Sequence, residues 1–283
     1  MKKIIICPNE KRDIDMQLTG ELEKLLRGLG ADVKITPFFE SAPGGSAARA
    51  FGSDLDDADC VICLGGDGTI LHISKATAKA NVPLLGINLG TIGFLAGLER
   101  DEWQEAARVV TDNCTVEHRM MLDVRVYRDG EEKVSETVLN DAVIERGAEE
   151  HMVHITARSD GREMCSFAGD GIIFSTPTGS TGYSMSAGGP VVEPEAEDFL
   201  MTPICAHTLP NQVFVLAPTR VLTAELIGAE ERSARLMVDG KNAFSLRNGD
   251  VVRVTRSEYV TKLVRIKDRD FYTLVNRKLT MKL

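Results

Sequence analysis

The feature that most constrains the fold is an alternation of short apolar runs with amphipathic segments over residues 1–118. Apolar runs such as residues 3–7 are typical of parallel strands that are buried on both faces. Further strands are predicted at residues 32–36, 60–64 and 83–87, and helices at residues 16–30, 70–80 and 101–111. This succession predicts a doubly wound, Rossmann-like α/β domain. Residues 38–54, rich in Gly, Ala and Ser, are predicted to contain a loop.

The pattern changes near His118, where short runs separated by turn residues replace the alternation. Turns are predicted at Asp129-Gly130 and at residues 159–162, 238–241 and 248–250, because Asp-Gly and Asn-Gly pairs favour tight turns. Many short strands with such turns predict an all-β, sandwich-like domain over residues 119–265. Its strands are predicted at residues 121–127, 134–145, 152–157, 163–167, 212–216, 221–226, 235–238 and 251–254. A last helix is predicted at residues 270–283, within a C-terminal segment formed by residues 266–283.

Composition excludes several classes of protein. A formal net charge of −9 makes the chain a poor candidate for binding nucleic acid or an anionic membrane, both of which need clustered Lys and Arg. No segment resembles the apolar helix of roughly 20 residues that a bilayer requires, and the apolar N-terminal run is too short for a secretory signal. The chain is therefore predicted to be cytoplasmic. Only Cys60 and Cys63 are spaced like metal ligands, and without a second pair they are predicted to be buried thiols.

The sharpest motif is Gly65-Gly66-Asp67-Gly68-Thr69, which lies between a predicted strand and a predicted helix. Ligands of open α/β sheets bind beyond the carboxyl ends of strands, where glycines and a helix N-terminus suit phosphate oxygens. A carboxylate there would repel phosphate unless it had a task. Asp67 could accept a proton from an attacking hydroxyl, or it could hold a metal ion. The alternative is that Asp67 only caps the helix.

A second motif extends from Asp170 to Pro190. Residues 171–190 combine many hydroxyl groups and glycines with Tyr183 and carry no charged side chain. Hydroxyls and backbone amides suit a polar, uncharged ligand such as a sugar or a base edge, and Tyr183 offers a flat face for stacking. The alternative, an exposed loop, is less favoured because a solvent loop of this length usually carries charged residues.

Other candidates are weaker. Asn140 and Asp141 interrupt an apolar strand, so they predict either a buried pair that needs a ligand or a turn at a strand end. Phe94 could form an apolar wall of a ligand site or belong to the core. His72 could face a phosphate or lie on the helix surface, and His151 has no neighbour that would complete a metal site.

Together these residues resemble the NAD kinase family. The resemblance rests on the Gly-Gly-Asp-Gly-Thr motif, on residues 90–95, on Asn140-Asp141, on residues 170–190 and on residues 202–207, in the family's order. The Gly-Gly-Asp-Gly element is shared with lipid kinases and phosphofructokinases, whereas the Thr-Pro-Thr-Gly-Ser-Thr-x-Tyr-Ser block is highly specific. The resemblance implies an α/β N-terminal domain, a β-sandwich-like C-terminal domain that binds NAD, and a last helix that returns to the first domain.

The resemblance also implies an activity and its participants. The expected reaction moves the γ-phosphoryl of ATP to the 2′-hydroxyl of the adenosine ribose of NAD and yields NADP and ADP. Mg²⁺ is expected with ATP, polyphosphate is an alternative donor, and the expected assembly is a homodimer or homotetramer. No nucleic acid and no membrane is expected as a partner.

Site residues follow from the resemblance position by position. Asp67 is the implied base; Asn140, Asp141, Thr181 and Tyr183 are implied to hold the adenosine part, with Phe94 as a wall. The nicotinamide side is implied to involve Asp170, Ser186 and Cys205, while His72 and His151 fall where a basic group can lie near the dinucleotide. The other implied substrate-binding positions are Gly66, Gly68, Thr69, Gly182, Ser184 and Met185.

The chain departs from the family pattern at two positions. Gly182 stands where the family usually has Ala, and Asp141 stands where Glu is common, so its carboxylate is one methylene shorter.

Two other functions compete with that of an NAD kinase. One is a lipid or sugar-phosphate kinase, against which the negative net charge and the neutral segment 171–192 argue. The other is a dinucleotide-binding sensor without activity, which would gain nothing from an anion at Asp67.

Overall fold

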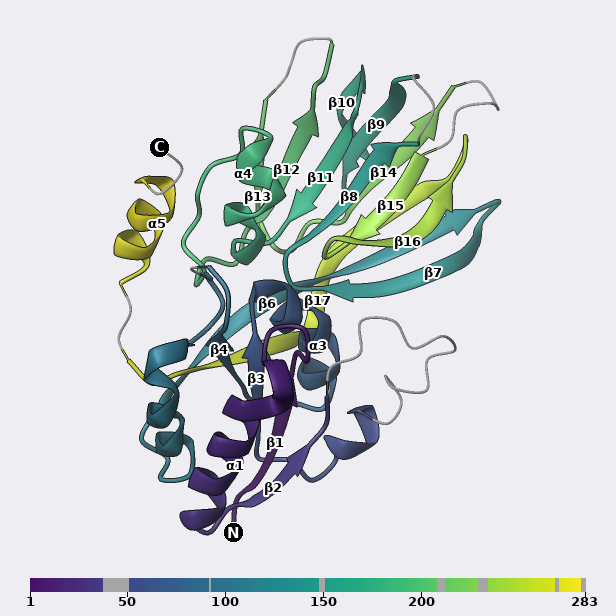
Figure 1. Ribbon diagram of the computed structural model, residues 1–283. Coiled ribbons are helices and arrows are strands. Elements are labelled where there is room, and N and C mark those ends of the chain that lie inside the picture. Colours follow the sequence, from purple (N-terminus) through teal and green to yellow (C-terminus); the bar gives the residue numbers. More distant parts are fainter. Residues whose placement is uncertain are drawn as a thin grey trace. The chain divides into compact units, whose positions relative to one another are not determined.

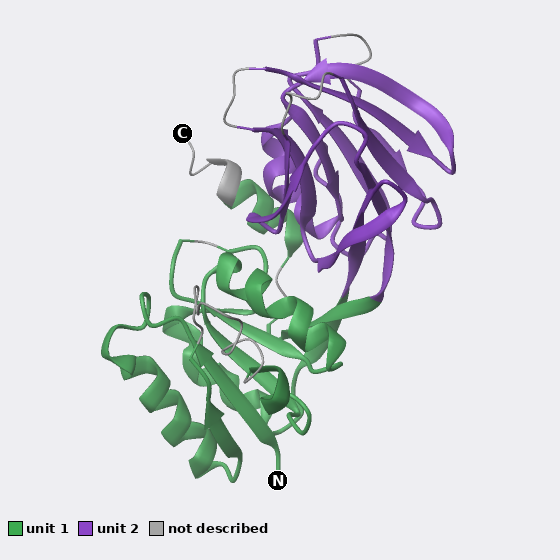
Figure 2. Ribbon diagram, turned by 90° about the vertical axis from the view of Figure 1, so that its right-hand side faces the viewer, with its two compact units in different colours: residues 1–118, 259–283 green, residues 119–258 purple. Residues whose placement is uncertain are grey.

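The computed structural model describes residues 1–37, 51–91, 93–147, 151–207, 212–228, 234–267 and 270–280 and divides into two compact units (Figures 1 and 2). Unit 1 holds residues 1–118 and 259–283, and unit 2 holds residues 119–258. Most of the loop predicted within residues 38–54 lies outside the described residues. No helix in the described ranges is long and apolar enough to cross a membrane.

Unit 1 is built on a parallel sheet in which the chain order is not the spatial order (Figure 1). Strands β2 (Asp32–Ile35), β1 (Lys3–Pro8), β3 (Cys60–Gly65) and β4 (Leu84–Asn88) lie side by side in that order. The short strand β5 (Leu98–Glu99) and the end of β17 (Val251–Arg265) both pair with β4 in parallel. The helices of this unit include α1 (Gln17–Gly28), α3 (Asp67–Lys79) and α5 (Phe271–Thr280), and 3₁₀ helices lie at Ile14–Met16 and Arg100–Val109.

Helices cover both faces of this sheet. Leu22 of α1 and Ala106 of the longer 3₁₀ helix share one apolar cluster with Leu85 and other residues of β1, β3 and β4. Gly86, the next residue of β4, faces the opposite side, where Ile70 of α3 lies so close that a Cβ on Gly86 would collide with it. Successive strand residues point to opposite faces, so α1 and α3 lie on different sides of the sheet. The predicted doubly wound α/β architecture is confirmed.

Two helix predictions in unit 1 need correction. The helix predicted at residues 70–80 begins at Asp67, because Gly66 adopts an extended conformation and serves as the N-cap. Asp67 therefore belongs to the first helical turn, where a carboxylate interacts favourably with the helix dipole. The helix predicted at residues 101–111 is a 3₁₀ helix, Arg100–Val109, whose start is closed by a capping box between Glu99 and Glu102.

Unit 2 is a sandwich of two sheets, as predicted. One sheet has the order β13 (Phe214–Leu216), β12 (Phe199–Ile204), β11 (Gly171–Ser175), β8 (Asp141–Arg146), β15 (Ala234–Val238) and β16 (Lys241–Leu246), with antiparallel neighbours. The other contains β10 (Arg162–Gly169), β9 (Val153–Ser159), β14 (Leu222–Ile227), the first part of β17, and the hairpin β6 (Thr115–Arg128) and β7 (Glu131–Val138). The buried core lies between them and draws side chains such as Phe174 and Leu222 from both sheets.

Three predicted hairpin turns of unit 2 have the same backbone form. At Asp129-Gly130, Asp160-Gly161 and Asp239-Gly240 both residues have positive φ, between 45° and 81°. This is the type I′ geometry that matches the twist of adjoining strands and favours Asn or Asp followed by Gly. The turn predictions at these positions are therefore confirmed.

The strand predictions in unit 2 were less complete. The single run predicted at residues 134–145 is wrong, since β7 ends at Val138 and β8 begins at Asp141. Strands β12 and β16 were not predicted, and β17 is 15 residues long where only residues 251–254 were expected. Strand β11 was not predicted either, although it forms the first part of the motif at residues 170–190.

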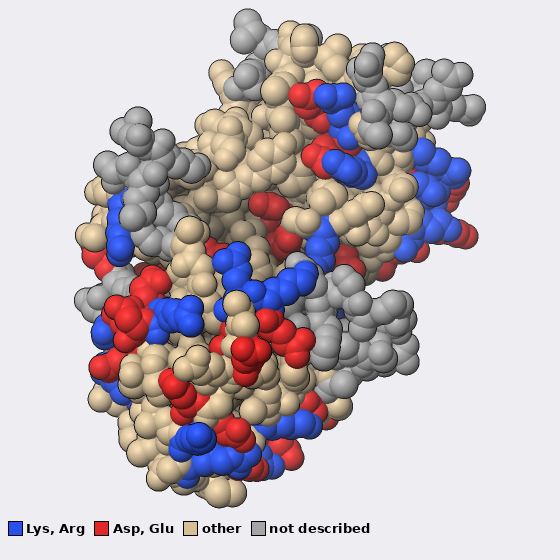
Figure 3. All heavy atoms as spheres, viewed as in Figure 1, with Lys and Arg blue, Asp and Glu red and all other residues tan. Residues whose placement is uncertain are grey.

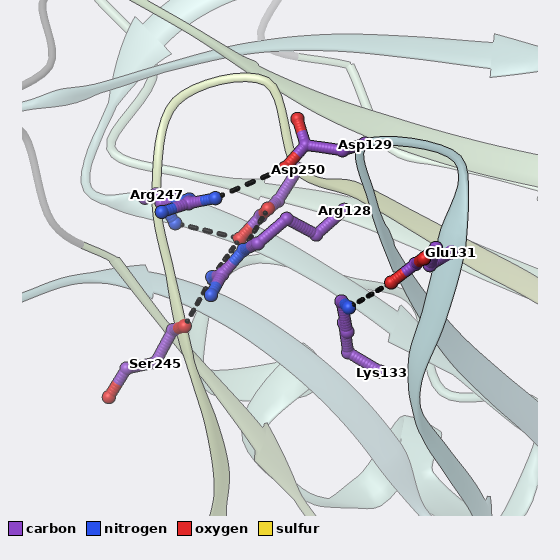
Figure 4. A network of polar contacts seen from close by, with 7 residues as sticks. All are labelled: Arg128, Asp129, Glu131, Lys133, Ser245, Arg247 and Asp250. Atoms are coloured by element: carbon purple, nitrogen blue, oxygen red, sulfur yellow. Dashed lines mark hydrogen bonds and ion pairs between the residues drawn. The ribbon is translucent and has the colours of Figure 1, made fainter.

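Charged side chains of unit 2 form a compact network at one edge (Figure 4). The Arg128 guanidinium makes two hydrogen bonds to Asp250, at 2.8 and 2.6 Å, and a third to the carbonyl of Ser245 at 3.0 Å. The Asp250 side chain is only 1% exposed, and Arg247 adds a backbone N–H bond to it and an ion pair to Asp129. On the face drawn in Figure 3, acidic and basic side chains are interspersed.

Candidate active site

The carboxylate of Asp67 is held by the main chain of a distant loop in unit 1. Its Oδ2 accepts the N–H of Phe94 at 2.8 Å, and its Oδ1 accepts the N–H of Leu95 at 3.1 Å. Asp67 is the first residue of α3, and Gly66 is the N-cap. The interpretation of Asp67 as a simple helix cap is therefore wrong.

Glycines make this close approach possible. An ideal Cβ on Gly93 would lie well under 3.0 Å from Oδ1 of Asp67 and 3.1 Å from its Cγ. A Cβ on Gly65 would collide in the same way with the side chain of Thr69, which is buried. Within the loop that follows β3, Asp67 is thus packed against residues 93–95, and Thr69 against Gly65.

A turn after β1 lies beside the same loop. The side-chain amide of Asn9 donates to Oγ1 of Thr69 at 3.0 Å, and its main-chain N–H donates to the carbonyl of Leu64 at 2.8 Å. Arg12, exposed on this turn, has Nη1 only 3.0 Å from the position of a Cβ on Gly90. Within the part of the chain that the structure describes, the Arg12 guanidinium has no hydrogen bond or ion pair. A cation therefore lies at the carboxyl ends of β1 and β4, where phosphates bind in open α/β sheets.

The remaining candidates of unit 1 are Phe94, His72 and the two cysteines of β3. Phe94 is half-buried, and its N–H is one of the two that hold Asp67. His72 lies on α3, three residues after Thr69, with its Nδ1 atom buried. Cys60 and Cys63 are buried thiols in β3, and burial raises the pKa of Cys60 to about 12. Among the described residues, no group of three or more His, Cys, Asp or Glu side chains is placed to hold a metal ion.

In unit 2, Asn140 and Asp141 form the link between β7 and the start of β8. The carboxylate of Asp239, in the turn after β15, accepts the N–H groups of Leu139, Asn140 and Asp141 at 2.9, 2.7 and 3.2 Å. The N–H of Asp239 donates in return to the carbonyl of Asp141 at 3.0 Å. The Asn140 Oδ1 atom is buried and accepts no hydrogen bond from any described residue. The sequence left two alternatives for Asn140 and Asp141, a turn at a strand end or a buried polar pair that needs a ligand. The structure has features of both.

Residues 171–190, called the hydroxyl-rich segment below, pack directly on the link formed by Asn140 and Asp141. The carbonyl of Asn140 accepts the N–H of Thr176 at 2.9 Å, and the carbonyl of Leu139 accepts the Thr176 hydroxyl at 2.6 Å. A Cβ on Gly179 would lie under 3.0 Å from the Asn140 carbonyl oxygen. An ideal Cβ on Gly182 would lie 3.7 Å from both Nδ2 of Asn140 and Oδ2 of Asp141. The two motifs that sequence patterns suggest separately thus form one surface in unit 2.

Asp141 and Asp239 form a coupled pair of carboxyl groups. Burial, and then the charge of Asp239, raise the pKa of Asp141 to about 7. Burial also raises the pKa of Asp239 to about 6, although its three N–H partners favour the charged form. The two groups cannot both be charged without cost, and the hydrogen bonds favour the anion on Asp239. Near neutral pH, Asp141 therefore carries the proton more readily than Asp239.

Individual residues of the segment differ in exposure. Tyr183 is 42% exposed, and burial followed by the charges of Glu145, Cys205 and Asp170 raises its pKa. Ser184 is fully buried, with its hydroxyl 2.9 Å from Oγ1 of Thr202, so it fastens the short helix α4 (Tyr183–Ser186) to β12. Thr181 and Met185 are partly buried, and Ser186 is exposed.

The residues expected on the nicotinamide side lie at the opposite end of β11 from Asp141. Asp170 precedes β11 and forms an ion pair with Arg146 at 2.9 Å. Gly171 is paired with Ile204, the residue before Cys205, which is exposed and has a φ of 47°. His151 is exposed and lies two residues before β9.

Comparison with known proteins shows which family the chain belongs to. The family model of the ATP-NAD kinase N-terminal domain matches residues 47–114, and that of the ATP-NAD kinase C-terminal domain matches residues 139–266. The NAD kinase of Natranaerobius thermophilus is 38% identical over 282 residues, which cover 99% of this chain and 98% of that protein. The NAD kinase of Acetivibrio thermocellus is 37% identical over 281 residues, 99% of this chain and 97% of that protein. The chain belongs to the NAD kinase family.

Solved structures of NAD kinases share the fold. A yeast NADH kinase complexed with NADH superimposes with a TM-score of 0.82 at 24% identity and covers 99% of this chain and 88% of that one. An NAD kinase from Archaeoglobus fulgidus in complex with ATP gives a TM-score of 0.73 at 25% identity, with coverage of 98% and 99%. The predicted resemblance to the NAD kinase family is confirmed, and the lipid and sugar-phosphate kinase alternatives are set aside.

Sequence patterns gave no role to three residues that contact the motif residues in the structure, Asn9, Arg12 and Asp239, and Gly93 entered only as part of residues 90–95. The polar run after β1 was a usable signal for the first two, because it interrupts an apolar strand at its carboxyl end. Asp239 was noticed only as part of a turn. Its carboxylate binds residues 98 to 100 positions earlier in the chain, a distance that no local pattern reaches.

Proposed function

We propose that this protein transfers the γ-phosphoryl of ATP to the 2′-hydroxyl of the adenosine ribose of NAD, with Asp67 as the general base. The observation that carries the proposal is the Asp67 carboxylate, fixed by two main-chain N–H bonds at the carboxyl end of β3 in a chain 38% identical to an NAD kinase. A carboxylate whose orientation is fixed in this way can accept the hydroxyl proton without reorganising first.

Besides the base, the protein has to position the two substrates and stabilise charge on the phosphates. Phosphoryl transfer passes through a loose transition state, so positioning and charge stabilisation supply most of the acceleration. The ribose oxygen attacks the γ-phosphorus, the bond to the β-phosphate oxygen breaks, and Asp67 takes the proton of the attacking hydroxyl late in the step. The two N–H bonds from Phe94 and Leu95 keep the Asp67 carboxylate in one orientation while the proton moves.

The donor phosphates belong at the Gly-rich loop. Main-chain N–H groups of Gly66 and Gly68 at the N-terminus of α3 suit phosphate oxygens, and Arg12 adds a positive charge beside them. Mg²⁺ is held typically by substrate phosphates and water with few carboxylates, so the ATP phosphates would supply most of its ligands. When bound with ATP, the ion would neutralise charge on the phosphates.

NAD recognition is assigned to the remaining predicted residues. Asn140 and Asp141 would hold the adenosine part with Thr181 and Tyr183, and Phe94 would supply an apolar wall. The buried, unsatisfied Oδ1 of Asn140 supports this assignment because a ligand donor would complete it. Asp170, Ser186 and Cys205 would lie on the nicotinamide side, and His72 and His151 would add basic groups near the dinucleotide.

Several finer expectations stay predictions. These are ATP rather than polyphosphate as the donor, a homodimer or homotetramer as the assembly, a cytoplasmic location, and the absence of nucleic-acid and membrane partners. Each follows from the family resemblance or from the negative net charge. Replacing ATP by polyphosphate in an assay of NADP formation shows which of the two donors the protein uses.

The decisive experiment measures NADP formation by the purified protein with NAD, ATP and Mg²⁺. We expect turnover with NAD and none with diacylglycerol or fructose 6-phosphate. Asp67→Asn should lower kcat by about 10²- to 10⁴-fold, the usual contribution of a general base, with little change in NAD binding. NAD binding without any NADP would favour the sensor alternative, and near-normal turnover by Asp67→Asn would remove the base assignment.

A further inference from the structure

We infer that Asp239 is a positioning residue for NAD binding: its carboxylate fixes the main chain of residues 139–141 and thereby aims the side chains of Asn140 and Asp141 at the ligand. The inference rests on the proposed function, in which that pair holds the adenosine part of NAD. Asp239 itself is not placed against the substrate. Its effect passes through the polypeptide segment that it holds.

Three consecutive N–H groups converge on this one carboxylate. Its Oδ1 accepts from Asn140 at 2.7 Å and from Asp141 at 3.2 Å, and its Oδ2 accepts from Leu139 at 2.9 Å. Successive N–H groups of this kind form a concave anion site, and bonds to a charged acceptor are stronger than neutral ones. The N–H of Asp239 returns a bond to the Asp141 carbonyl. The link 139–141 is therefore held from two directions by one residue.

The turn itself does not need a carboxylate. Type I′ turns accept Asn or Gly at the first central position as readily as Asp. The other two Asp-Gly turns of unit 2 direct their carboxylates elsewhere: Asp129 pairs with Arg247, while Asp160 pairs with Arg220 at 2.7 Å and accepts the N–H of Val221. Both of these are exposed. Asp239 alone among the three binds the main chain of a candidate ligand segment.

The segment that Asp239 fixes is also fixed from its other side. The Asn140 carbonyl accepts from Thr176, in the hydroxyl-rich segment, so both faces of the Asn140 peptide are occupied. Its Oδ1 is then left buried without a partner among the described residues. An unsatisfied buried acceptor is costly unless a ligand donor pairs with it. The arrangement is what a preorganised ligand contact requires.

The charge of Asp239 also acts on Asp141. Asp141 is 7% exposed, and its raised pKa has burial as the first cause and Asp239 as the second. The other titratable groups near the pair are Glu136 of β7, whose charge acts on Asp239, and Tyr183 of α4, whose pKa responds to Asp141. Removing the charge of Asp239 should therefore lower the pKa of Asp141 and move any pH dependence of NAD binding to lower pH.

Asp239→Asn tests the inference, because it keeps the turn but replaces one acceptor oxygen by an amide that cannot accept. Asp160→Asn is the matched control, with the same turn type in the same unit. Steady-state kinetics should show KM for NAD raised about 10- to 100-fold in Asp239→Asn, the loss expected for a hydrogen bond to a charged group. KM for ATP should stay unchanged, and the pH profile of KM for NAD should shift downward.

A double-mutant cycle separates positioning from general stability. If Asp239 acts through Asn140, the effect of Asp239→Asn on KM for NAD should largely vanish in an Asn140→Ala background. Additive effects, or equal KM values in Asp239→Asn and Asp160→Asn, would overturn the inference. Should Asp239→Asn fail to fold by circular dichroism, Asp239→Ser gives the same test, since its hydroxyl retains one acceptor. Failure of the wild-type protein to form NADP would instead remove the proposed function.

Discussion

A methyl group placed at Gly93 should disable the base without touching the substrate sites. The backbone of Gly93 does not have the positive φ that would exclude alanine, so the cost of Gly93→Ala comes from contact alone. Its Cβ would fall well under 3.0 Å from Oδ1 of Asp67, whereas ordinary contact begins at 3.4 Å. To relieve the clash, the carboxylate would have to move on the order of 1 Å, a displacement that can cost about 10²-fold in rate.

The same displacement would stretch the two N–H bonds that hold Asp67. Hydrogen bonds to a charged group contribute about 1.5–3 kcal/mol each, so their weakening should lower stability by about 1–3 kcal/mol in total. We therefore expect Gly93→Ala to lower kcat by about 10²-fold with KM for NAD nearly unchanged. The assay is steady-state NADP formation, with denaturant unfolding as the measure of stability.

A second glycine provides the control. Gly20 lies within α1 of the same unit, and a Cβ there would meet nothing within 4 Å. Gly20→Ala should keep full activity and gain about 0.5–1 kcal/mol, because alanine is the better helix former. Wild-type kcat in Gly93→Ala would refute the idea that residues 93–95 fix the base. A rise in KM for NAD at constant kcat would refute it too, since it would place Gly93 at the substrate.

Further changes test other parts of the structure. Arg12→Ala should raise KM for ATP about 10-fold and leave KM for NAD unchanged, as measured by varying each substrate in turn. Gly182→Ala should retain activity within a few-fold, because its Cβ would lie 3.1 Å from the Gly179 carbonyl and 3.7 Å from the Asn140 and Asp141 side chains, which a small shift relieves. Arg128→Ala should cost about 3 kcal/mol in urea unfolding, since it leaves the buried Asp250 carboxylate without its bidentate partner. The raised pKa of Asp141, about 7, means that the folded protein binds its proton more tightly than the unfolded chain, so unfolding free energy should fall as pH rises from about 4 to 7, and Asp141→Asn should flatten that dependence.

Local patterns were sufficient where the physical cause is local. The apolar run of β3 followed by glycines predicts a strand that ends at a ligand edge, and the three Asp-Gly turns depend only on the backbone preferences of two residues. The start of α3 was misplaced by three residues because Gly66 can serve as an N-cap, which the weak helix propensity of glycine hides. Strand β12 escaped because Pro203 within it argues against a strand.

The site depends on contacts that no local pattern contains. Asp67 was chosen from its motif, but the two N–H groups that orient it come from residues 94 and 95, and Gly93 matters only because that loop folds back onto α3. The Arg12 guanidinium reaches Gly90 only after β1 and β4 take their places in the sheet. Such contacts are set by strand order, which the sequence constrains weakly.

Both units use one physical device in opposite senses. In unit 1, main-chain N–H groups of Phe94 and Leu95 hold a carboxylate that is proposed to do the chemistry. In unit 2, the Asp239 carboxylate holds the main chain so that neighbouring side chains can bind. A carboxylate that accepts several N–H bonds is fixed in its orientation, because turning it would break more than one bond at once. The fall in kcat expected for Gly93→Ala would come from lost orientation of the Asp67 carboxylate, since the substitution keeps Phe94 and Leu95, whose N–H groups hold it, in the chain.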